Sequence, residues 1–173
     1  GDLVMCSGAG GYAEFAVSDL SRTNPLPRTT SDDNGYDLKT AATLPVALQT
    51  MHDAIATNGQ MREGDAVLIL GASSGVGILG MQIARFLGAS TVIGTSTDKA
   101  RRSELTRFGA DLALDTNDPK WPDKVMEVTN NKGVNLVVDQ ISAGTISSAM
   151  RCTAILGRIV NVGRLGGMTG DFD

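Results

Sequence analysis

The chain contains little of the chemistry from which metal sites and disulfide frameworks are built. It has a single histidine, His52, and two cysteines, Cys6 and Cys152, in 173 residues. The cysteines lie far apart with no CxxC spacing, so the sequence predicts neither a zinc site nor a disulfide framework. We expect both to be reduced thiols in a cytoplasmic protein, and we assign no role to His52.

Long apolar runs and an excess of positive charge are also missing. No run approaches the roughly 18 apolar residues that cross a bilayer, so we expect no membrane partner. The formal net charge is −4 at pH 7, which argues against a general nucleic-acid binder because neutralising phosphates requires a basic surface. The chain opens on GDLVM rather than on an initiator methionine, and we expect it to begin within a folded domain.

From Lys39 onward, apolar runs of strand length alternate with segments of helical spacing. The predicted strands are 66–72, 90–96, 111–115, 134–140 and 157–163, and the predicted helices are 42–58, 76–88, 98–108, 120–131 and 144–152. Strands that are apolar throughout fit a parallel sheet covered on both faces. The sequence therefore predicts an α/β fold with a doubly wound parallel sheet over residues 39–173.

The first 38 residues have a different pattern. The segment GGYAEFAV at 10–17 resembles a β-hairpin arm, and the segment 24–37 is rich in Pro, Asp, Ser and Asn, which predicts a loop. We expect residues 1–38 to be the remnant of a β domain and a connecting loop.

The segment AVLILGASSGVG at 66–77 is the most informative part of the chain. A buried strand ends there at a glycine-rich turn, and the following segment has helical spacing. The missing side chains at Gly71, Gly75 and Gly77 let a pyrophosphate approach, and the N–H groups that open the helix face its charge. The same layout also occurs as an ordinary strand, turn and helix in other α/β domains, so the glycines alone do not decide.

The end of the next strand indicates which dinucleotide fits. An acidic side chain there would bind the ribose 2′-OH of NAD, but this position is the uncharged Ser96. Lys99, Arg101 and Arg102 follow within a turn, and cations with several donors suit a 2′-phosphate, which favours NADPH. Asp98 lies about 20 residues past the glycine-rich turn, where a ribose-binding acid can stand, but we interpret it as the cap of the next helix. The alternative is that KARRSELTR is only the solvated face of a surface helix.

Several motifs together resemble the medium-chain dehydrogenase/reductase superfamily in its zinc-free quinone oxidoreductase branch. They stand in family order over nearly the whole chain: GDLVM at 1–5, GGYAEFAV at 10–17, AATLPVALQT at 41–50, GASSGVGILGMQIA at 71–84, FGAD at 108–111, GVNLVVD at 133–139 and GRIVNVG at 157–163. The resemblance implies that residues 1–38 close a GroES-like catalytic domain. It also implies that residues 39–173 form a Rossmann dinucleotide-binding domain without the last part of its sheet.

The resemblance further implies a cofactor site for NADPH. Its expected residues are Ser74, Gly75, Val76 and Gly77 at the pyrophosphate, Ser96, Lys99 and Arg101 at the adenosine phosphate, Gly163 and Thr50 near the nicotinamide, and Asp139 at the crevice. For Thr50 and Asp139 the alternatives are a helix hydroxyl and a capping carboxylate. The chain departs from the family pattern at Ser74, where a glycine is common, at Thr116, where many relatives carry a Tyr, and in ISAG at 141–144.

Function follows from the resemblance as an expectation. The full-length protein is expected to transfer hydride from NADPH to a small-molecule acceptor, a quinone or an α,β-unsaturated carbonyl, and to form a homodimer. No catalytic residue is nominated, and the chain alone is expected to be inactive. The alternatives are a zinc-dependent alcohol dehydrogenase relative, an enoyl reductase domain of a larger synthase, and a non-catalytic NADPH-binding module.

Overall fold

The computed structural model describes residues 1–26 and 38–170. Contacts divide the chain into two units, residues 1–49 and 50–173, and each is described by itself. Most of the loop predicted at 24–37 lies outside the described residues. No described helix combines the length and the apolar character that crossing a membrane requires.

The first unit contains a short antiparallel strand pair. β1 (Val4–Cys6) pairs with β2 (Thr23–Pro25), with Met5 opposite Asn24. A 3-10 turn at Leu20–Arg22 leads into β2, and α1 (Leu38–Ala42) and the start of α2 (Leu44–His52) complete the unit.

The hairpin arm predicted at 10–17 is wrong. The segment contains no strand, and Tyr12, Phe15 and Val17 are almost fully exposed. A strand needs a second strand to satisfy its backbone N–H and C=O groups. The strand that pairs with β1 is instead β2, whose last two residues were predicted to belong to the loop. The resemblance of 10–17 to a hairpin arm therefore did not correspond to a paired strand.

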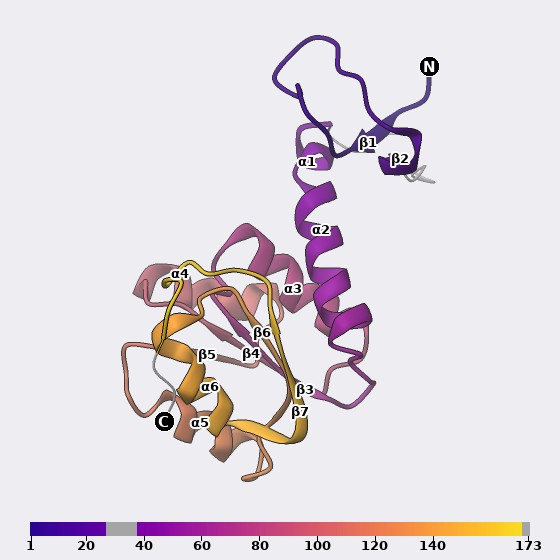
Figure 1. Ribbon diagram of the computed structural model, residues 1–173. Helices are drawn as coiled ribbons and strands as arrows, with labels where there is room; N and C mark the ends of the chain where they lie inside the picture. Colours follow the sequence, from indigo (N-terminus) through magenta and orange to yellow (C-terminus); the bar gives the residue numbers. More distant parts are fainter. Residues whose placement is uncertain (27–37, 171–173) are drawn as a thin grey trace. The chain divides into compact units, whose positions relative to one another are not determined.

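The second unit is built around a five-stranded parallel sheet in the order β5-β4-β3-β6-β7 (Figure 1). Its strands are β3 (Ala66–Leu70), β4 (Thr91–Thr95), β5 (Leu112–Leu114), β6 (Val134–Asp139) and β7 (Thr153–Asn161). Every neighbouring pair is parallel. The predicted α/β class with a Rossmann-type doubly wound sheet is confirmed, and β7 begins earlier than predicted.

Helices cover both faces of this sheet (Figure 1). They are α3 (Gly75–Phe86), α4 (Lys99–Glu104), α5 (Trp121–Val128) and α6 (Ile146–Arg151). A 3-10 turn at Leu105–Phe108 follows α4, and another at Ala143–Thr145 precedes α6. The helix α2 continues as a π-helical segment at Asp53–Asn58. Successive side chains of a strand point to opposite faces. Accordingly, Val67 and Ile69 of β3 pack in one core cluster with Met81 of α3. Leu68 packs in the other cluster with Trp121 of α5.

β3 lies at the switch point of the sheet: the strands that follow it first, β4 and β5, lie on one side, and β6 and β7 lie on the other. β3 pairs with β4 on one side and with β6 on the other, up to Leu70 opposite Asp139. The connections after β3 and β6 therefore leave in opposite directions, which opens a crevice at this edge of the sheet.

The two thiols provide a test of this packing. Cys152 is fully buried, and burial raises the pKa of its thiol to about 12, whereas Cys6 is exposed. Because the thiolate is the reactive form, we expect N-ethylmaleimide at about pH 8 to label Cys6 and to leave Cys152 unmodified until denaturant unfolds the sheet. Peptide mass spectrometry of native and unfolded protein measures both sites. Equal labelling in the native protein would contradict the packing of Cys152.

Candidate functional site

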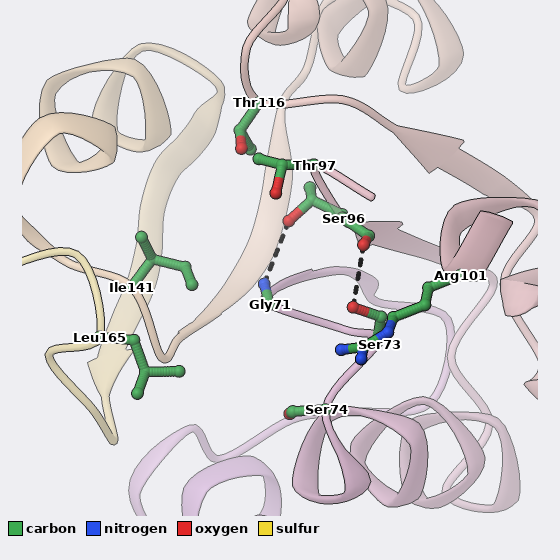
Figure 2. A pocket seen from close by; sticks show the side chains of 10 residues that line it. Gly71, Ser73, Ser74, Ser96, Thr97, Arg101, Thr116, Ile141 and Leu165 are labelled. Carbon is green, nitrogen blue, oxygen red and sulfur yellow. Dashed lines mark hydrogen bonds between the residues drawn. The ribbon is translucent and has the colours of Figure 1, made fainter. Parts of the chain in front are cut away.

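A cleft of about 350 Å³ lies at the carboxyl ends of the strands (Figure 2). The lining residues are Gly71, Ser73, Ser74, Thr95, Ser96, Thr97, Arg101, Thr116, Ile141 and Leu165. They come from the segments that follow all five strands of the sheet. Figure 2 shows Ile141 and Leu165 on one side of the cleft, across from the serines and Arg101. The cleft therefore occupies the crevice where open α/β sheets bind ligands.

The glycine-rich turn is held in place by the end of β4. Gly71 has a φ of +75°, a conformation that glycine adopts without strain. Its N–H donates to Thr95 Oγ1 at 3.1 Å, and the Ala72 N–H donates to the Thr95 carbonyl at 2.9 Å. The Ser74 N–H then closes the turn on the Gly71 carbonyl at 3.1 Å. One residue of β4 thus fixes the backbone at the floor of the cleft.

The turn opens directly into α3, whose N-cap is Ser74. Its Oγ accepts a hydrogen bond from the Gly77 N–H at 2.9 Å. The N–H groups of Gly75 and Val76 have no hydrogen-bond partner in the described part of the chain. Free N–H groups at the start of a helix carry partial positive charge and bind anions. Gly75 and Val76 therefore retain the donors that a pyrophosphate needs.

The backbone N–H of Gly77 was predicted to bind the pyrophosphate. In the structure this N–H donates to Ser74 Oγ. A Cβ at this position would lie 2.6 Å from both Ala72 Cα and the Gly71 carbonyl oxygen. Its missing side chain therefore lets α3 pack closely against the turn. At Gly75, by contrast, a Cβ would meet nothing within 4 Å.

Hydroxyl groups and one arginine form the far end of the cleft. Ser96 is buried, and its Oγ lies 2.9 Å from Ser73 Oγ, which joins the end of β4 to the turn. Thr97 and Thr116 add two further hydroxyl-bearing side chains. Arg101 is exposed and forms no ion pair with any described residue. Its guanidinium is therefore available to an anionic ligand.

The other cations of this segment are placed differently. Arg102 donates to the Ser96 carbonyl at 2.6 Å and pairs with Asp115 at 3.0 Å, so it holds the segment after β4 in place. Lys99 is exposed at the start of α4 and does not line the cleft. Asp98 caps α4, as predicted, by accepting from the Arg101 N–H at 2.9 Å, and this hydrogen bond lowers the pKa of its carboxyl.

Asp139 faces inward rather than into the cleft. It is fully buried, and its Oδ1 accepts from the N–H groups of Ile141 and Ser142 at 2.8 and 2.9 Å. Its Oδ2 has no hydrogen-bond partner among the described residues. Ser142 and Ala143 follow at positive φ, 61° and 49°. The carboxylate thus caps a strained turn, as in the structural alternative stated from the sequence.

Neither Gly163 nor Thr50 lines the cleft. The Gly163 carbonyl accepts from Ser142 Oγ at 3.0 Å, and a Cβ at Gly163 would lie 2.9 Å from the Gln140 carbonyl oxygen. Thr50 is half-buried in α2. Their predicted proximity to a nicotinamide stays a prediction.

Sequence reasoning missed several residues of the site. Thr95, Ile141 and Leu165 line the cleft, and Gln140 is hydrogen-bonded to its turn. Three of these four stand at or directly after the carboxyl end of a predicted strand. A search of those positions for polar side chains would have found Thr95 and Gln140, whereas Leu165 carries no such signal.

Comparison with known proteins agrees with this geometry. The profile of a family described as "Zinc-binding dehydrogenase" matches residues 75–173, more than half of the chain. Quinone oxidoreductase of Rattus norvegicus is 32% identical over 165 residues, which cover 94% of this chain and 48% of the relative. The chain thus spans about half the length of this curated relative.

Two solved structures share the fold. A mycobacterial protein in complex with NADPH is 29% identical with a TM-score of 0.80, over 95% of this chain and 48% of that chain. The JamJ enoyl reductase is 26% identical with a TM-score of 0.68, over 74% of this chain and 38% of that chain.

The family description names zinc, but the described residues do not fit a metal ion. No three His, Cys, Asp or Glu side chains among them lie close enough together to hold one. The family match, the sheet order and the glycine-rich turn before α3 agree. The chain belongs to the zinc-binding dehydrogenase family of the medium-chain dehydrogenase/reductase superfamily.

Proposed function

We propose that the full-length protein is an NADPH-dependent oxidoreductase that reduces a quinone or an α,β-unsaturated carbonyl compound. The observation that carries this proposal is the composition of the cleft. It combines an open helix N-terminus with hydroxyl groups and Arg101, and none of the described residues that line it is acidic. A carboxylate that would favour the ribose 2′-OH of NAD is therefore missing from the lining, and a cation suited to a 2′-phosphate is present.

The residues of the cleft and the start of α3, which follows its lining residue Ser74, divide the dinucleotide between them. The N–H groups of Gly75 and Val76 suit the pyrophosphate, because they are open and lie at the positive end of α3. Arg101 can donate two parallel N–H bonds to a phosphate, and Ser96 and Thr97 supply hydroxyl groups beside it. Lys99 adds charge nearby without lining the cleft.

NADPH supplies the hydride when it is bound, and the described residues hold and orient the nucleotide. Ile141 and Leu165 present apolar side chains on their side of the cleft. The likeness to quinone oxidoreductase supports the choice of acceptor. A homodimer and a cytoplasmic location belong to the same proposal and rest on the resemblance to the family.

A second candidate is the enoyl reductase domain of a larger synthase, which the likeness to the JamJ enoyl reductase favours. Both candidates use the same nucleotide and the same hydride transfer. They differ in the acceptor, so turnover of a free quinone against an enoyl thioester by the full-length protein separates them.

Replacement of Arg101 tests the part that its guanidinium has in nucleotide binding. Replacing it by alanine removes the charge that faces the 2′-phosphate, so we expect the Kd for NADPH to rise about tenfold while the Kd for NADH stays within about twofold. Fluorescence titration of the chain with each nucleotide measures both values. Arg107→Ala is the matched control, because Arg107 pairs with Glu104 and does not line the cleft. An equal loss of both nucleotides in Arg101→Ala would contradict the assignment.

Alanine substitution distinguishes the parts of Gly75 and Gly77 in the first turn of α3. Gly77→Ala forces its Cβ onto the backbone of the turn, so we expect the free energy of unfolding to fall by about 1 to 3 kcal/mol. Gly75→Ala has open space for its Cβ, so we expect unchanged stability but weaker NADPH binding, because the methyl group lies where the pyrophosphate approaches. Urea unfolding and nucleotide titration of both variants test this. Full NADPH affinity in Gly75→Ala would show that the pyrophosphate does not approach this glycine.

A further inference from the structure

We propose that Gln140 is a positioning residue for nucleotide binding, which acts by fixing the pyrophosphate-binding turn from inside the protein. This inference rests on the proposed function, since it requires a dinucleotide on the turn at residues 71–74. Gln140 does not line the cleft and therefore acts through other residues.

The Gln140 side chain is buried and hydrogen-bonded at both ends of its amide. It is 5% exposed and directly follows β6. Its Nε2 donates to the carbonyls of Leu70 and Gly71 at 3.1 and 3.2 Å. Its Oε1 accepts from Ser74 Oγ at 2.9 Å. One carboxamide thus joins the last residue of β3, the first glycine of the turn and the N-cap of α3.

The bonds to the carbonyls meet a need that the fold creates. The pairing of β3 with β6 ends at Leu70 and Asp139. Beyond this pair the segments that follow the two strands diverge, so the strand ladder supplies no further partners there. A buried carbonyl without a donor is costly. The Gln140 amide supplies a donor to the Leu70 carbonyl and a second donor to the Gly71 carbonyl, which also accepts from the Ser74 N–H. It thereby helps to determine where the turn leaves the sheet.

The bond to Ser74 has a second consequence. The Ser74 hydroxyl has one hydrogen, which it donates to Gln140, and its oxygen accepts from the Gly77 N–H. The hydroxyl is therefore committed to the protein, and the open donors of this turn are the N–H groups of Gly75 and Val76. A residue without a hydroxyl group at position 74 could not form this bond. Gln140 and Ser74 therefore work as a pair.

Gln140 also links the turn to the opposite side of the cleft. Its carbonyl accepts from the Leu165 N–H at 3.1 Å, and Leu165 and the neighbouring Ile141 line the cleft. A shift of Gln140 would thus be transmitted to both sides of the bound nucleotide.

Three probes distinguish positioning from a general structural role. ADP-ribose has the pyrophosphate without the 2′-phosphate, adenosine 2′-monophosphate has the reverse, and NADPH has both. We expect Gln140→Leu in the 173-residue chain to weaken ADP-ribose and NADPH about tenfold and adenosine 2′-monophosphate less than about twofold. Calorimetric titration measures all three affinities.

Ser74→Ala provides a second variant that keeps the bonds from Gln140 to the carbonyls. We expect a smaller loss for the same two probes, and a double variant no weaker than Gln140→Leu alone, because the two residues act through one contact. Gln82→Leu is the matched control, since Gln82 is exposed on α3 and does not line the cleft.

The outcomes separate the two levels of the proposal. Equal weakening of all three probes by both variants, or unchanged ADP-ribose binding, would overturn the positioning role while leaving the proposed function intact. If the wild-type chain binds none of the three probes, the proposed function is overturned and the inference with it.

Discussion

The parallel pairing of β3 with β6 is the constraint on which the site depends. It places two strands side by side whose connections leave in opposite directions, so the sheet edge opens between them. The same divergence leaves backbone groups of the turn without a ladder partner. Thr95 of β4 and Gln140 after β6 supply hydrogen bonds to that turn from its two sides. The turn is thus fixed before a ligand arrives, which reduces the ordering cost of binding.

The groups that would bind the pyrophosphate and the 2′-phosphate of a dinucleotide lie in two separate places, one at the start of α3 and the other after β4. Among the described residues, the N–H groups of Gly75 and Val76 at the start of α3 have no hydrogen-bond partner and Arg101 after β4 has no ion-pair partner. The segment after β4 also offers hydroxyl groups. Arg102, one residue on, is committed to Asp115 and to the Ser96 carbonyl. The chain therefore uses two adjacent arginines for two purposes, one to build the site and the other to remain available to the ligand.

Much of this could be predicted from the sequence because the signals were local. The buried run before Gly71, the helical spacing after it and the capping role of Asp98 each depend on a few adjacent residues. The errors were not local. The segment 10–17 resembles a hairpin arm but contains no strand, and Arg102 forms an ion pair with Asp115, which follows the next strand. Gln140 was missed because its partners are about 70 residues away.

Nuclear magnetic resonance of the isotopically labelled chain during titration with NADPH and then with NADH tests the account most directly. We expect the backbone amide signals of Gly75 and Val76 to shift with both nucleotides, and the Arg101 side-chain signal to shift with NADPH alone. Shifts confined to residues away from the cleft and from the start of α3, or an Arg101 signal that responds equally to both nucleotides, would contradict the proposed recognition of NADPH.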